Sequence, residues 1–98
     1  MRAQIEQRDG VIHVSGELNA ATVPRLLSDA AALFAQSGAD LTIDLAGVSR
    51  ADSSGLALLL DWMRSARQQQ QQLHFQRLPA QLLDMARVSG IEELLPLK

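Results

Sequence analysis

Hydrophobic and polar residues alternate in three short stretches of the chain, which is the pattern of a β-strand with one buried face. The stretches are residues 4–8, 41–45 and 73–78. A further strand is expected over 11–14, because it follows Asp9-Gly10, a residue pair that favours a two-residue hairpin turn. The first two strands should therefore be antiparallel, and the polar stretch 15–19 should end the second.

Apolar residues recur at helical spacing in three other segments. The first segment should begin at Thr22, a suitable N-cap, and end at Gly38. The second should begin within Ala51–Gly55 and continue to about Gln68. Pro79 should open the third, whose apolar residues are Leu82, Leu83, Ala86 and Val88, and Gly90 should close it. One short helical turn should follow over 91–97.

This order of elements, β-β-α-β-α-β-α, predicts an α/β domain with a one-sided sheet. The alternating strands indicate one face covered by the helices and one wetter face, which should carry Thr42, Asp44, His74 and Gln76. The last three strands are joined through helices and should run parallel, by right-handed crossovers. Since no repeat or linker is visible, we expect a single domain over residues 1–98.

Composition narrows the functional classes. The formal net charge is −2 and the arginines are scattered among acids, so no basic field for nucleic acid is expected. The absence of cysteine excludes disulfide and thiolate chemistry. The first residues form no apolar signal segment, and the longest apolar run, Leu56–Leu60, is far below the ~20 residues of a membrane span. We therefore expect a soluble cytoplasmic domain.

The candidate site is the start of the second helix, where Asp52, Ser53, Ser54 and Gly55 follow one another. Backbone N–H groups in the first turn of a helix lack partners and carry a partial positive charge, which favours Asp and Ser there. A capped helix explains these residues without any further function. A hydroxyl beside an acid at an exposed helix start is also a suitable switchable contact surface.

Catalysis is not expected at this site. A serine nucleophile needs a base within about 3 Å, but His13 and His74 both fall within predicted strands. Two histidines without cysteine make no convincing zinc site, and Gly47 and Gly55 lack the lysine and spacing of a phosphate-binding loop. We predict that the protein is not an enzyme and uses no metal or cofactor.

The phase of the second helix suggests a docking patch. With Leu56 as reference, an apolar stripe faces the sheet and comprises Leu56, Leu59, Leu60, Met63 and Ala66. Leu58 then lies on the water-facing side and Trp62 at its margin, so both are assigned to a partner-binding surface. The alternative is that Trp62 packs against its own sheet. A charge at Leu58 is expected to cost at most about 0.5 kcal/mol.

Three stretches resemble the STAS domain family of anti-sigma-factor antagonists: Gly16–Asn19, Leu41–Leu45 and Val48–Leu56. The resemblance covers essentially the whole chain and implies a SpoIIAA-like fold, with a four-stranded mixed sheet and helices packed mainly on one face. In partner-switching members a serine kinase phosphorylates the first hydroxyl after the Asp, which is Ser53 here. Such a phosphate, expected beside Asp52 and Asp44, would change binding more than fold. Asn19 stands where the family often has Asp.

Within the family, the chain looks most similar to the MlaB-like STAS subunit of the Mla phospholipid-transport ABC complex. The features are the short length, Val48-Ser49-Arg50 before Asp52, the run from Gly55 to Leu60, and the end near Pro96. This resemblance implies a non-catalytic subunit that binds the ABC ATPase and supports lipid asymmetry of the outer membrane. It would lie at the inner membrane through its partner, without touching lipid. The Ser53-Ser54 pair is more typical of partner-switching members, whose partner is an anti-sigma serine kinase.

Overall fold

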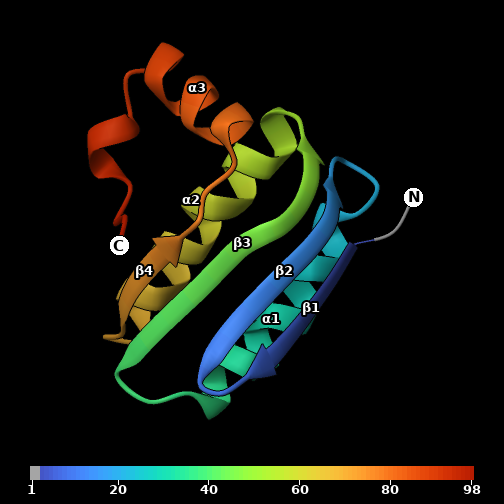
Figure 1. Cartoon of the computed structure of the whole chain (residues 1–98). Helices are drawn as coiled ribbons and strands as arrows, with labels where there is room; N and C mark the ends of the chain where they lie inside the picture. The colour runs from blue at the N-terminus through green and yellow to red at the C-terminus, as the bar shows by residue number, and fades with distance from the viewer. Residues whose placement is uncertain (1–2) are drawn as a thin grey trace.

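A computed structural model describes residues 3–98 of the chain; Met1 and Arg2 lie outside the described residues. Four strands form one sheet in the order β1-β2-β3-β4 (Figure 1). They are β1 (Ala3–Arg8), β2 (Val11–Leu18), β3 (Asp40–Ala51) and β4 (Gln72–Gln76). β1 pairs with β2 antiparallel, whereas β2, β3 and β4 are mutually parallel, which confirms the predicted strand directions.

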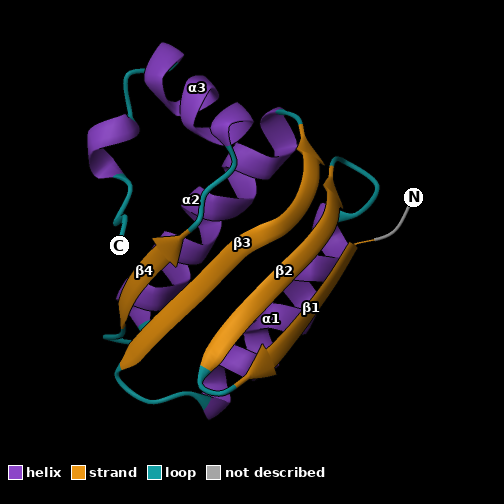
Figure 2. Cartoon of the chain, viewed as in Figure 1, coloured by secondary structure: helices purple, strands orange, loops and turns teal. Residues whose placement is uncertain are grey.

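The helices are α1 (Val23–Gln36), α2 (Ser53–Gln68) and α3 (Ala80–Val88), followed by the short 3-10 helix η1 (Glu92–Leu94). α1 and α2 lie on the same face of the sheet, and α3 lies at the end of the sheet where β3 leads into α2 (Figure 2). Among residues 3–98, no helix lies on the opposite face of the sheet (Figure 2). The predicted element order and one-sided cover are therefore confirmed.

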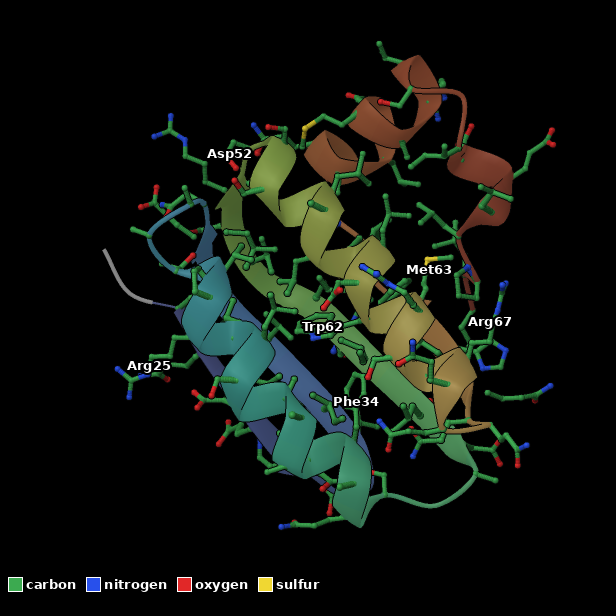
Figure 3. The ribbon with its side chains drawn as sticks, turned by 180° about the vertical axis from the view of Figure 1, so that it is seen from behind. Arg25, Phe34, Asp52, Trp62, Met63 and Arg67 are labelled. Atoms are coloured by element: carbon green, nitrogen blue, oxygen red, sulfur yellow. The ribbon has the colours of Figure 1, made fainter. Side chains whose placement is uncertain are left out.

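The core lies between the sheet and the two long helices. Strand residues that point toward the helices are almost fully buried, among them Ile12, Val14, Ile43 and Leu45. Phe34 of α1 and Trp62 of α2 point toward one another, with ring centroids 6.2 Å apart at an angle of 52° (Figure 3). This tilted pair is a favourable aromatic arrangement and joins the two helices.

Two strands are longer than the alternation predicts. The polar stretch 15–19 was expected to end the second strand, but β2 continues to Leu18. Residues 46–50, between the predicted strand and the predicted helix start, were expected to form a loop. Instead β3 continues through them to Ala51, with Gly47 opposite Ser15 and Ala51 opposite Leu18. The register shifts twice along this pairing, which marks bulges in β3. Bulges interrupt the two-residue period and bend the strand, so alternation alone does not reveal this part of β3.

Asp44 lies on the face of the sheet opposite the helices, as predicted, where it lines a hollow with His13 and Arg77. It is not wet, however, because it is only 1% exposed. Its carboxylate accepts a hydrogen bond from the backbone N–H of Ala46 at 2.8 Å, within the first bulge. It also accepts hydrogen bonds from the side chains of Gln76 and Arg77. Gln76 is the last residue of the neighbouring strand β4, and Arg77 follows it. Asp44 thus satisfies the backbone of the bulge and ties β3 to the end of β4.

A candidate protein-binding site at the start of helix α2

The connection between β3 and α2 is a single residue, Asp52, held by hydrogen bonds on both sides. The backbone N–H of Asp52 donates to the carbonyl of Leu18 at the end of β2, at 3.1 Å. The backbone N–H of Ala51 donates to the side-chain oxygen of Gln81 in α3, at 2.9 Å. The start of α2 is therefore fixed to both the sheet and α3.

Asp52 also caps the helix. Its carboxylate accepts a hydrogen bond from the backbone N–H of Ser54 at 2.8 Å, which satisfies one free donor of the first turn. Ser53 is the first helical residue and is exposed, whereas Ser54 is half-buried. The structure therefore places Asp52, Ser53 and Ser54 at the start of α2, with the Ser53 side chain open to solvent. A negative group on Ser53 would lie at the favourable end of the helix dipole.

Gly55 lets the first turn of α2 pack closely on the sheet. A methyl group added at Gly55 would lie 3.1 Å from the Cβ atoms of both Ala51 and Leu18, and 3.3 Å from Leu82 Cδ2. These distances are shorter than ordinary van der Waals contact, and two of the three neighbours are fixed to strands. Gly55 is therefore a packing residue rather than part of the exposed surface.

A shallow apolar groove of about 290 Å³ opens between the start of α2 and α3. We call it the α2–α3 groove; its lining comprises Ser53, Leu56, Asp84, Met85, Val88 and Ser89. Val88 was expected on the apolar face of the third helix, but it is 88% exposed, while Leu82 and Ala86 of the same helix are buried. The groove thus places an exposed apolar side chain close to the Ser53 hydroxyl.

The predicted docking patch at Leu58 and Trp62 is wrong, because the two residues are 1% and 2% exposed. They lie one turn apart on α2, and Trp62 packs against Phe34 of α1. Leu60, which was expected to face the sheet, is instead 38% exposed. The helix is therefore rotated relative to the prediction, and of the six predicted partner-binding residues only Asp52, Ser53 and Ser54 are accessible for contact.

Asp44 and the histidines all lie well away from Ser53. Asp44 precedes the end of β3 by seven residues, which is roughly 23 Å along a strand. His13 pairs with Asp44 in the sheet, and His74 pairs with Thr42, further still from the start of α2. A phosphate on Ser53 would therefore not lie beside Asp44, and neither histidine is placed to act as a base for Ser53.

Sequence reasoning did not identify three residues of this region: Gln81, Met85 and Val88. Gln81 and Met85 contribute through the packing of α3 against the start of α2, which no local pattern shows. Val88 fitted the apolar pattern of α3, and a pattern does not distinguish a buried valine from one that lies past the edge of the core.

Among residues 3–98, no three potential metal-ligating side chains lie together. No helix among the same residues is long and apolar enough to cross a membrane.

Comparison with known proteins agrees with this geometry. The family described as "Mlab, STAS domain" matches residues 1–96. The chain belongs to the STAS domain family. A relative from Listeria monocytogenes, named anti-sigma-B factor antagonist, is 31% identical over 97% of this chain and 86% of its own length.

Solved structures show the same fold. Unphosphorylated SpoIIAA, an anti-sigma factor antagonist, superposes with a TM-score of 0.73 at 20% identity, over 99% of this chain and 88% of that one. An anti-sigma factor antagonist from Mycobacterium paratuberculosis superposes with a TM-score of 0.71 at 27% identity, over 98% and 83%. The STAS domain described here therefore has the SpoIIAA-like fold, an α/β arrangement with a mixed four-stranded sheet, as expected.

Proposed function

We propose that this STAS domain is a non-catalytic protein-binding switch of the anti-sigma-factor-antagonist type, regulated by phosphorylation of Ser53. The observation that carries the proposal is the exposed Ser53 hydroxyl on a rigid helix start beside an apolar groove. The Listeria relative, named an anti-sigma-B factor antagonist, supports this class of function. The proposed partner is a serine kinase that acts as the anti-sigma factor.

The physical basis of the switch is charge rather than refolding. A phosphate adds about −1.5 to −2 charges and three acceptor oxygens at Ser53. The free N–H groups of the first turn and the helix dipole stabilise this charge, so the domain should stay folded. The partner surface, in contrast, would meet a desolvated anion next to Asp52 and the α2–α3 groove. Binding is therefore expected to be lost while the domain keeps its structure.

A second candidate is an accessory subunit that binds the ATPase of a Mla-type ABC phospholipid transporter. The specific observation in its favour is the family match over residues 1–96, whose description names MlaB. In this function the same surface would hold the ATPase and support assembly and activity of the complex at the inner membrane. The domain would maintain outer-membrane lipid asymmetry through its partner, without binding lipid itself.

One experiment separates the two candidates. The purified domain is titrated calorimetrically with the purified anti-sigma serine kinase and, separately, with the purified ABC ATPase encoded by the same genome. The first candidate predicts binding to the kinase, and transfer of phosphate from ATP to Ser53 that mass spectrometry detects. The second predicts binding to the ATPase and no transfer. Binding to neither protein would contradict both.

Matched variants test the role of the hydroxyl. Ser53→Ala should bind the kinase but accept no phosphate, whereas Ser54→Ala should be phosphorylated like the wild type. Ser53→Asp should bind the partner at least tenfold more weakly. Phosphate found on Ser54 in place of Ser53 would show that the proposed assignment of the switch to Ser53 is wrong.

A further inference from the structure

Val88 is the most exposed large apolar side chain among residues 3–98, and its position is unusual. Single exposed apolar residues are common on protein surfaces and need no function. Val88, however, lines the α2–α3 groove together with half-buried Met85 and with Leu56, which is 8% exposed. Val88 therefore contributes almost no burial to the core of the domain. It forms one wall of a groove that Ser53 also lines.

The size of the groove limits what it accommodates. Its volume of about 290 Å³ lies just below the roughly 300–1,000 Å³ of sites that enclose small-molecule ligands, and the groove is open to solvent. Apolar walls with few polar groups favour a hydrophobic side chain over a polar ligand. The groove is therefore suited to one or two apolar side chains of a protein partner.

The charges around the groove indicate the character of that partner. Asp84 is the one charged residue that lines the groove, and Asp52 precedes Ser53. The neighbouring cation, Arg87, lies 3.1 Å from Glu92 and 3.3 Å from Asp84 and so has two carboxylate partners. On the other side of Asp52, Arg50 lies 4.0 Å from Glu17, and both line a hollow together with Asp52. Four carboxylates with two guanidiniums leave this end of the molecule acidic, which complements a basic segment.

We propose that the α2–α3 groove receives an apolar side chain carried by a basic segment of the protein partner. This inference rests on the proposed function and adds the chemistry of the partner segment. It also explains how a phosphate on Ser53 would act: the added charge would lie beside a buried apolar contact, where it would lose its solvation without gaining a cation. Basic residues around the anchor would meet the phosphate only at the solvated rim, where an ion pair contributes little.

The test uses whichever protein, kinase or ABC ATPase, binds the wild-type domain in the titration above. Val88→Ser removes the apolar wall without adding charge, and we expect about tenfold weaker binding. Leu94→Ser is the matched control, because Leu94 is also an exposed apolar residue, 63% exposed, and lies outside the groove. It should change the affinity less than twofold.

A charge reversal tests the basic character of the segment. Asp84→Lys turns a rim attraction into a repulsion, so it should weaken binding about threefold and make the affinity less sensitive to salt. Asp29→Lys, the same change on α1, should have little effect. Tighter binding by Asp84→Lys would show an acidic partner segment and overturn the proposal. Unchanged binding by Val88→Ser, with binding still lost in Ser53→Asp, would overturn the groove assignment and leave the proposed function intact.

Two further outcomes also contradict the inference. If sedimentation shows that the wild-type domain dimerises and that Val88→Ser is monomeric, the groove holds a second copy of this chain and not a basic partner segment. If neither purified protein binds the wild-type domain, the proposed function fails and the inference fails with it.

Discussion

At the scale of single residues, two aspartates of one strand–helix unit have opposite environments. Asp44 is buried and accepts hydrogen bonds from Ala46, Gln76 and Arg77, whereas Asp52 is exposed and caps α2. The sequence correctly predicts that Asp52 lies at a capped helix start, because a cap depends only on neighbouring residues. The environment of Asp44 depends on side chains more than thirty residues away and on a bulge, and neither is visible in the alternation.

The burial of Asp44 predicts a stability that depends on pH. Burial alone raises the pKa of Asp44, but hydrogen bonds from Arg77, the Ala46 N–H and Gln76, with the charge of Arg77, outweigh it. They lower the pKa from 3.8 to about 2. The unfolded chain therefore takes up this proton at higher pH than the folded chain, and the stabilisation is lost as the pH falls from about 4 to about 2.

We expect Asp44→Asn to lower the free energy of unfolding by about 2 kcal/mol near neutral pH, because the charge-dependent stabilisation is removed. The difference from wild type should shrink as the pH falls toward about 2. Urea unfolding over this pH range measures both quantities, with the exposed Asp40→Asn as control. A difference that stays constant down to the lowest pH would show that the charge of Asp44 is not what stabilises the fold.

At the scale of elements, the sequence predicts the existence, order and direction of the strands and helices, but not the rotation of α2. Residues 55–60 contain no polar side chain, so the apolar pattern of this first half fits more than one phase. The phase is set by Gly55, which allows close contact with Ala51 and Leu18 and contributes no hydrophobic signal of its own. The face with Leu58 and Trp62 consequently turns toward α1.

The rotation of α2 is tested by a pair of leucines. Leu58→Ala should lower the free energy of unfolding by about 2–4 kcal/mol, because it leaves a cavity at a residue that is 1% exposed. Leu60→Ala, at a residue 38% exposed, should cost less than about 1 kcal/mol. Chemical denaturation of both variants gives the comparison. If both variants lost the same unfolding free energy, or Leu60→Ala lost more, the result would support the helix rotation predicted from the sequence and contradict the one described here.

The close approach at Gly55 makes a second prediction at this scale. Gly55→Ala should destabilise the fold by about 1 kcal/mol or more, although alanine favours a helix by a similar amount, because the added methyl overlaps Cβ atoms fixed on two strands. Gly38→Ala is the control, since an added methyl there meets nothing within 4 Å. Thermal unfolding that shows a more stable Gly55→Ala would mean that the strands adjust to the helix at little cost.

At the scale of the whole molecule, the core and the candidate site occupy different places. The core lies between the sheet and the faces of α1 and α2, whereas Ser53 and the α2–α3 groove lie at one end, where α3 meets the start of α2 (Figure 1). The connection at Asp52 is fixed by backbone and side-chain hydrogen bonds, so it presents Ser53 without depending on a flexible loop. Binding and stability should therefore respond to different substitutions.

This separation is tested by comparing Ser53→Asp with Leu58→Ala in two measurements. Ser53→Asp places a carboxylate in the first turn of α2, which is neutral or stabilising by at most about 1 kcal/mol, so the melting temperature should stay the same or rise by no more than about 8 °C. Its affinity for the partner should nevertheless fall at least tenfold, while Ser53→Ala binds normally. Leu58→Ala should lower the melting temperature by about 10 °C or more and keep its affinity at temperatures where it is folded. If Ser53→Asp instead lost stability in proportion to affinity, the switch would act by unfolding the start of α2, and a rigid contact surface would no longer explain the site.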